Sequence, residues 1–200
     1  VRGVIKELRE DGSSFDVYIH DEFYGSFNIN IFGEHMIENA LACIYMCYLE
    51  GISLDDITKY LNEFHGAKRR FSEEKIGDVV LVDDYAHHPN EVATVLKTAR
   101  QKYPDKELVP DLIPYTISRT KAFYKDFANV LKEADKVYVT DIEPAREKFS
   151  DFPGVSSDLI IKEILGAEHI SSEEISKLYK HKNGVIPFMG CKDPTWLIDA

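Results

Sequence analysis

Two acids, a tyrosine and two histidines directly follow a short apolar run, in the stretch DDYAHHPNEV at residues 83–92. Carboxylates and imidazoles are the side chains that most often move protons or hold polar ligands near neutral pH. Pro89 suits the first position of a helix, and Glu91 complements the positive end of a helix dipole. The run Val79–Val82 therefore predicts a buried strand that ends in a polar turn, with a helix from Pro89. Such a turn is either a ligand-binding edge of an α/β sheet or a plain, well-capped connection.

A second chemically suggestive group is the basic cluster Lys68-Arg69-Arg70, which Phe71 closes. The chain has 24 Lys and Arg against 35 Asp and Glu, a formal net charge of −11, so three adjacent cations stand out. Guanidinium groups bind phosphate oxygens in pairs, so the cluster is either a local anion site or a solvated linker. The acidic balance of the whole chain argues against a nucleic-acid partner or an anionic membrane surface.

Several other kinds of site are not indicated. The phosphate loop GxxxxGK[ST], the dinucleotide motif GxGxxG and the zinc motif HExxH are absent, and the adjacent His87 and His88 are poorly spaced for one metal ion. No metal site is predicted. The three cysteines, at 43, 47 and 191, form no CxxC pair and fit reduced, buried thiols in a cytoplasmic protein. No apolar run is long enough to insert in a membrane.

The first part of the chain is expected to be α+β. Residues 1–31 alternate apolar and polar side chains between turn signals, which predicts a short antiparallel meander. Residues 35–50 have helical periodicity, and a second helix is expected from the N-cap Ser53 to Gly66. We place a domain boundary near Phe71.

From residue 72 onward, strand and helix patterns alternate, which is typical of an open, mostly parallel sheet with helices on both faces. The predicted strands are 79–83, 107–113, 136–141, 168–170 and 184–189. The predicted helices are 89–103, 118–134, 156–165 and 172–181, with a last one from about 194. Right-handed crossovers would bring the strand ends Asp83-Asp84, Ile113-Pro114, Asp141 and Met189-Gly190 to one edge.

Six stretches resemble the Mur ligases in order and spacing: GEHMIENALA at 33–42, GAKRRF at 66–71, DDYAHHPNEV at 83–92, PYTISRT at 114–120, DIEPAREK at 141–148 and FMG at 188–190. The resemblance covers essentially the whole chain. It implies that 1–71 is the end of the family's central ATPase domain and that 72–200 is its C-terminal, Rossmann-like ligase domain. It also implies a bacterial enzyme of the cytoplasm.

The activity implied by the resemblance is an ATP-dependent and Mg²⁺-dependent amide ligation in peptidoglycan synthesis, important for the cell wall, cell shape and division. The SRT and AREK segments are most similar to the branch that joins L-alanine to the carboxylate of UDP-N-acetylmuramate through an acyl phosphate. Because the phosphate loop is absent, the magnesium ligands are expected mainly outside this chain. The chain alone is then expected to be inactive, with the N-terminal half of the same enzyme as its partner.

The resemblance also implies roles for individual residues. Asn39 would lie beside the adenine, Arg70 would meet an ATP phosphate, and Asp84 would contact the nucleotide. The side chains expected around the amino-acid substrate are Tyr85, His87 and Arg119, and the expected catalytic residues are Arg70, Asp84 and His87.

The chain departs from the family pattern at Met36, Ile113 and Tyr115, and in the segment Cys191-Lys192-Asp193 after FMG. Met36 replaces an amide side chain, and Ile113 and Tyr115 replace two polar groups at the expected crevice. A non-catalytic binding module with the ligase fold is therefore the alternative function. A generic flavodoxin-like domain is a third possibility, which no phosphate loop supports.

Overall fold

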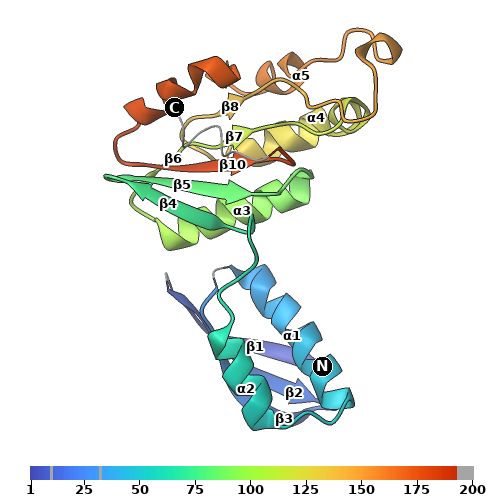
Figure 1. The fold of residues 1–200 in the computed structure, drawn as a ribbon, viewed down its shortest axis with the longest axis vertical. Coiled ribbons are helices and arrows are strands. Elements are labelled where there is room, and N and C mark those ends of the chain that lie inside the picture. The colour runs from blue at the N-terminus through green and yellow to red at the C-terminus, as the bar shows by residue number, and fades with distance from the viewer. Residues whose placement is uncertain (10, 32, 193–200) are drawn as a thin grey trace. The chain divides into compact units, whose positions relative to one another are not determined.

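The computed structural model describes residues 1–9, 11–31 and 33–192. The helix expected from about 194 lies outside these residues. The chain divides into two compact units, the first made of Val1–Ala67 with Gln101–Pro104, and the second made of Lys68–Arg100 and the chain from Asp105 on (Figure 1). The basic cluster Lys68–Arg70 thus packs with the second unit. The domain boundary near Phe71 stays a prediction.

The first unit is an antiparallel meander covered by two helices, as the sequence predicts. Its elements are β1 (Arg2–Arg9), β2 (Gly12–Ile19), β3 (Glu22–Ile29), α1 (Glu34–Leu49) and α2 (Leu54–Glu63). The core consists of side chains from the inner sheet face and from both helices, among them Phe15, Phe27, Ile44 and Ile57. Ser53 caps α2 because its Oγ accepts a hydrogen bond from the Asp56 amide at 3.2 Å.

The second unit is built on one sheet with the strand order β4-β5-β10-β7-β8-β9, and β6 also pairs with β10. These strands are β4 (Ser72–Ile76), β5 (Val79–Asp84), β6 (Glu107–Leu108), β7 (Asp111–Leu112), β8 (Tyr138–Val139), β9 (Glu168–His169) and β10 (Gly184–Met189). All pairings are parallel except that of β4 with β5. The mostly parallel sheet predicted from the sequence is confirmed.

Both faces of this sheet are covered. Every residue of β10, and all of β5 except Asp83, is buried, although successive side chains point to opposite faces. Leu178 packs on the face that holds Leu81 and Phe188. The helical segments are α3 (Pro89–Lys102), α4 (Ile117–Leu131), η1 (Phe149–Asp151), α5 (Asp158–Ile161) and η2 (Ser172–Lys180). Among the described residues no helix is long and apolar enough to cross a membrane.

Several predicted elements are shorter than expected. The strand predicted at 107–113 is divided into β6 and β7, because Pro110 has no N–H to give to a neighbouring strand. The helix predicted at 156–165 shrinks to the single turn of α5, and the helix predicted at 172–181 is the 3₁₀ segment η2.

The strand ends that the sequence predicts at one edge do meet there. In the sheet register, Met189 lies opposite Asp84 on one side and opposite Leu112 on the other, and Leu112 lies opposite Val139. The carboxyl ends of β5, β10, β7 and β8 therefore form a single edge, and it carries the residues of the candidate site.

Candidate functional site

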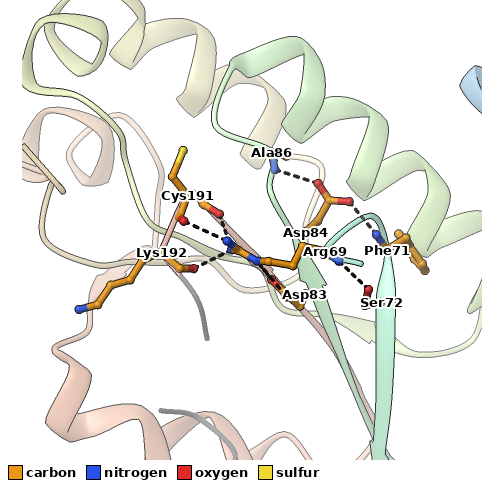
Figure 2. A network of polar contacts seen from close by, with 9 residues as sticks. Arg69, Phe71, Ser72, Asp83, Asp84, Ala86, Cys191 and Lys192 are labelled. Atoms are coloured by element: carbon orange, nitrogen blue, oxygen red, sulfur yellow. Dashed lines mark hydrogen bonds and ion pairs between the residues drawn. The ribbon is translucent and has the colours of Figure 1, made fainter. Parts of the chain in front are cut away.

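Asp84 is the last residue of β5 and lies at this edge of the sheet. Its side chain is buried, Oδ2 accepts a hydrogen bond from the Phe71 amide at 2.8 Å, and Oδ1 accepts one from the Ala86 amide at 2.8 Å (Figure 2). Burial raises the pKa of Asp84, and the two amide bonds and the charge of Arg70 oppose that rise. Both oxygens are thus engaged with the backbone, and the predicted contact of Asp84 with a nucleotide stays a prediction.

Arg69 is engaged even more completely, although the sequence predicts no role for it apart from its place in the basic cluster. Its Nε donates to Asp83, with 3.1 Å to Oδ2, and its two Nη atoms donate to the carbonyl oxygens of Gly190, Cys191 and Lys192 at 2.7–3.0 Å (Figure 2). Its guanidinium carbon also lies 5.1 Å from the ring centroid of Tyr85. Arg69 thereby ties the basic cluster to the turn after β10.

Arg70, by contrast, is exposed, and in the part of the chain that the structure describes no hydrogen bond involves its guanidinium. Hydrogen bonds from the backbone amides of His87 and His88 lower the pKa of Glu91 against its burial, and the charge of Arg70 adds a smaller effect in the same direction. The same charge opposes the rise of the pKa of Asp84, so Arg70 lies within electrostatic reach of both carboxylates. The structure therefore brings Arg70 and Asp84 together and leaves the Arg70 guanidinium available for an anion.

The aromatic and basic side chains expected around the amino-acid substrate also come together. The ring of His87 meets Tyr85 edge-on at 5.3 Å and Tyr115 at 5.8 Å between centroids. Arg119, in the first turn of α4, donates from Nη1 to the Tyr115 carbonyl oxygen at 3.0 Å. Tyr115 was noted from the sequence only as a departure, but it connects His87 to Arg119.

His87 has a defined tautomer. Its Nδ1 lies 2.8 Å from the carbonyl oxygen of Tyr85, and a carbonyl oxygen can only accept a hydrogen bond. Nδ1 therefore carries the proton in the neutral ring, and Nε2 keeps its lone pair. Glu91 fixes the backbone here, because its Oε2 accepts hydrogen bonds from the amides of His87 at 2.9 Å and His88 at 3.1 Å.

Glu147 is a residue of this edge to which the sequence analysis assigned no role. Its Oε2 accepts a hydrogen bond from the Ser118 amide at 2.8 Å, and its Oε1 accepts from the hydroxyls of Ser118 and Thr116. These bonds, those of Ser118 first, lower the pKa of Glu147. Since Ser118 lies in the first turn of α4, Glu147 caps the helix that carries Arg119.

Asn39 lies in the other unit, on the exposed side of α1, so the described structure does not group it with Arg70. It lines a cavity of about 440 Å³ between β3, α1 and α2 whose other walls are mostly apolar, including Met36, Cys43 and Tyr60. Its Nδ2 lies 3.7 Å from the sulfur of Met36. All three cysteines are free, but Cys43 is exposed and Cys47 and Cys191 are only partly buried, so the expectation of buried thiols is wrong.

No group of three His, Cys, Asp or Glu side chains that could hold a metal ion occurs within residues 1–9, 11–31 and 33–192.

A parallel α/β sheet whose carboxyl edge carries a free arginine, an oriented histidine and a capped helix start is typical of enzymes that act on anionic ligands. A family model described as Mur ligase, glutamate ligase domain, matches residues 69–183. The chain belongs to the Mur ligase family, and the resemblance drawn from its motifs is confirmed.

Relatives within the family agree along nearly the whole chain. The UDP-N-acetylmuramate–L-alanine ligase of Lactobacillus johnsonii is 48% identical over 188 residues, which are 94% of this chain and 42% of the relative. The UDP-N-acetylmuramate–alanine ligase structure from Thermotoga maritima has a TM-score of 0.76 at 25% identity and covers 97% of this chain and 43% of its own. The MurF ligase from Thermotoga maritima, solved in complex with ADP, has a TM-score of 0.69 at 17% identity and so supports the fold alone; the match covers 98% of this chain and 44% of that one.

Proposed function

We propose that this chain is the C-terminal part of an ATP-dependent ligase of the bacterial cytoplasm that joins L-alanine to UDP-N-acetylmuramate. The near full-length similarity to curated ligases of that name supports the proposal, although the chain spans only about 42% of their length. The observation that carries it is the grouping of His87, Tyr115 and Arg119 at the sheet edge that also holds Arg70.

The reaction has two steps. The muramyl carboxylate attacks the γ-phosphorus of ATP, which gives an acyl phosphate and ADP; the alanine amine then attacks the acyl carbon, and phosphate leaves. Catalysis of such a transfer depends on positioning and on cations that balance developing phosphate charge. Arg70 is suited to that task because its guanidinium is exposed.

The amino-acid side of the reaction falls to His87 and Arg119. Alanine enters as an ammonium ion and must lose a proton before its nitrogen can attack. His87 is a candidate base, since the hydrogen bond of its Nδ1 to the Tyr85 carbonyl leaves Nε2 to accept that proton. Arg119 is suited to the alanine carboxylate through a charge-assisted pair.

The nucleotide contacts are part of the same proposal. The apolar cavity beside Asn39 suits a flat purine ring, so we assign the adenine to it. The described residues have no cluster for a divalent cation, so we assign the Mg²⁺ ligands to the N-terminal part that the relatives carry. That part of the ligase is the proposed partner of this chain.

The test is a fusion of the N-terminal part of the Lactobacillus johnsonii relative to this chain, hereafter the fusion ligase. We expect phosphate release that requires ATP, UDP-N-acetylmuramate and L-alanine together. Arg119→Gln should raise KM for alanine by about tenfold or more, as expected for loss of a charged pair. Arg100→Gln is the matched control, because Arg100 pairs with Asp135 at 2.9 Å in the same unit without being assigned to the site. Equal effects of the two substitutions would contradict the amino-acid site.

A binding module without catalysis remains a second candidate, and one observation favours it. Ile113, which replaces a polar residue of the family pattern, is buried, and a Cβ placed on Gly190 would lie 2.7 Å from the Cβ of Ile113. This part of the edge therefore offers packing in place of a polar group. Calorimetric binding of a nonhydrolysable ATP analogue without any turnover of the fusion ligase would select this second function.

A further inference from the structure

We propose that Arg69 is a positioning residue, which anchors the linker Lys68–Phe71 to the sheet edge and acts on the reaction only through Arg70. The effect on the reaction rests on the proposed function, in which Arg70 meets phosphate. The anchoring of the linker does not depend on it.

The donors of Arg69 are already used within the protein. An arginine has five N–H donors. The Nε–H is directed to Asp83, Nη1 uses one N–H on the Cys191 oxygen, and Nη2 uses both on the oxygens of Gly190 and Lys192, so four of the five are engaged. A phosphate would have to displace several of these bonds. Arg69 therefore stabilises the position of the linker, and the neighbouring Arg70 is the arginine whose guanidinium can bind a ligand.

The linker is fixed on both sides of Arg70. On one side, Arg69 accepts a backbone hydrogen bond from the Tyr85 amide at 3.1 Å, and its own amide donates to Ser72 Oγ at 2.9 Å. On the other side, the Phe71 amide donates to the buried carboxylate of Asp84 at 2.8 Å. Figure 2 shows these contacts of Arg69 and Phe71, and Arg70 lies between the two anchored residues in the sequence.

The backbone conformation shows why such anchors are needed. Arg69 and Phe71 have φ of 57° and 54°, in the left-handed region that residues with a Cβ seldom occupy. A linker of ordinary residues would leave this conformation unless contacts outside it were more favourable. The guanidinium of Arg69 and the carboxylate of Asp84 supply those contacts, so loss of either should release the linker and let Arg70 move.

The first test measures the anchor in this chain by amide hydrogen exchange. In Arg69→Gln we expect the amides of Phe71 and Tyr85 to exchange about tenfold faster or more. The reason is that local opening of the linker then no longer requires the hydrogen bonds of the Arg69 guanidinium to be broken. Arg69→Lys keeps the charge but not the planar set of N–H donors, so its amide exchange rates should lie between those of Arg69→Gln and those of the unchanged protein. Arg100→Gln should leave both amides unchanged. Unchanged exchange in Arg69→Gln would overturn the proposal. If Arg69→Gln fails to fold, the comparison is made with Arg69→Lys, provided that its melting temperature is close to that of the unchanged protein.

The second test asks whether Arg69 acts through Arg70, with a double-mutant cycle in the fusion ligase. Arg70→Gln should lower kcat by about a hundredfold, as is typical for removal of one charge-stabilising donor. Arg69→Gln alone should lower kcat without changing KM for alanine, and added to Arg70→Gln it should cost no more than about twofold. Multiplying effects would show that Arg69 acts independently of Arg70 and would overturn the proposal. A fusion ligase without any turnover would contradict the proposed function, while hydrogen exchange would still decide the anchor.

Discussion

At the scale of single residues, Asp111 is unusual because its carboxyl group is fully buried inside the parallel sheet. It lies on β7 between Phe188 and Tyr138 in the register, and neither of its oxygens has a hydrogen-bond partner among the described residues. Burial alone raises its pKa to about 7. A buried carboxyl without partners is far more easily accommodated protonated than charged.

This raised pKa predicts how stability depends on pH. Because the pKa of Asp111 is about 7 when folded and 3.8 in an unperturbed side chain, the folded state binds the proton more tightly. The stabilising proton is present at low pH, and stability falls as pH rises through the window between these two values. Between about pH 5 and about pH 8, the chain should lose about 2–3 kcal/mol of unfolding free energy relative to Asp111→Asn. Urea denaturation of both proteins across this range measures the difference, and parallel pH profiles would contradict the pKa.

Asp84 predicts a loss of stability on substitution with its isostere. In Asp84→Asn the side-chain nitrogen cannot accept, so either the Phe71 or the Ala86 amide loses its partner. An unpaired buried donor costs about 1–3 kcal/mol, which should appear as a lower denaturation midpoint with an unchanged slope. Asp126→Asn, on the exposed side of α4, is the control and should change stability little. Equal midpoints for Asp84→Asn and the unchanged chain would show that these hydrogen bonds contribute little.

At the scale of secondary-structure elements, α4 depends on a side chain outside it. Glu147 accepts from the Ser118 amide, so Glu147→Ala removes the acceptor of that amide and the first turn should fray. Arg119 lies in that turn, so KM for alanine of the fusion ligase should rise severalfold, roughly as for a lost cap, while KM for ATP stays unchanged. Glu133→Ala, at an exposed position just beyond the other end of α4, is the matched control. A rise in both KM values would indicate a general loss of structure.

The sequence predicted the elements with strong apolar patterns and missed one without such a pattern. The strands of the parallel sheet were predicted because long runs such as Val79–Val82 are apolar on both faces. The charged segment Ser72–Ile76 is not among the predicted strands, but it is the edge strand β4, all of whose residues are exposed. An edge strand needs no apolar alternation, because its backbone hydrogen bonds to β5 suffice.

The candidate site was predictable to a similar extent. The motifs pointed to Arg70, His87 and Arg119, and the structure places all three at the edge of the second unit. Arg69 had no such signal, because its partners at Gly190–Lys192 are more than a hundred residues away in the chain and are backbone atoms. Sequence motifs report side chains that recur together, and they carry little information on which carbonyl oxygens a guanidinium will meet.

At the scale of the whole molecule, the chain consists of two units that each have a hydrophobic core of their own. We therefore expect the two to open separately in native-state hydrogen exchange. Ile44→Ala removes a fully buried side chain from the first unit and should lower its opening free energy by about 2–5 kcal/mol, with the slow amides of β5 and β10 unaffected. Leu112→Ala should have the converse effect. Equal acceleration in both units by either substitution would show that the chain unfolds as one body.

The hydrogen bonds of Arg69 to carbonyl oxygens also determine which substitutions residues 190–192 can tolerate. The two Nη atoms of Arg69 donate only to main-chain oxygens of residues 190–192, so we expect that substitutions of Cys191 and Lys192 leave these hydrogen bonds in place. Gly190 has no such latitude, because any larger residue would collide with Ile113. In a randomised library of residues 190–192, functional clones should keep the glycine and vary at the other two positions. The side chains of this turn can thus change while its carbonyl oxygens still accept hydrogen bonds from Arg69.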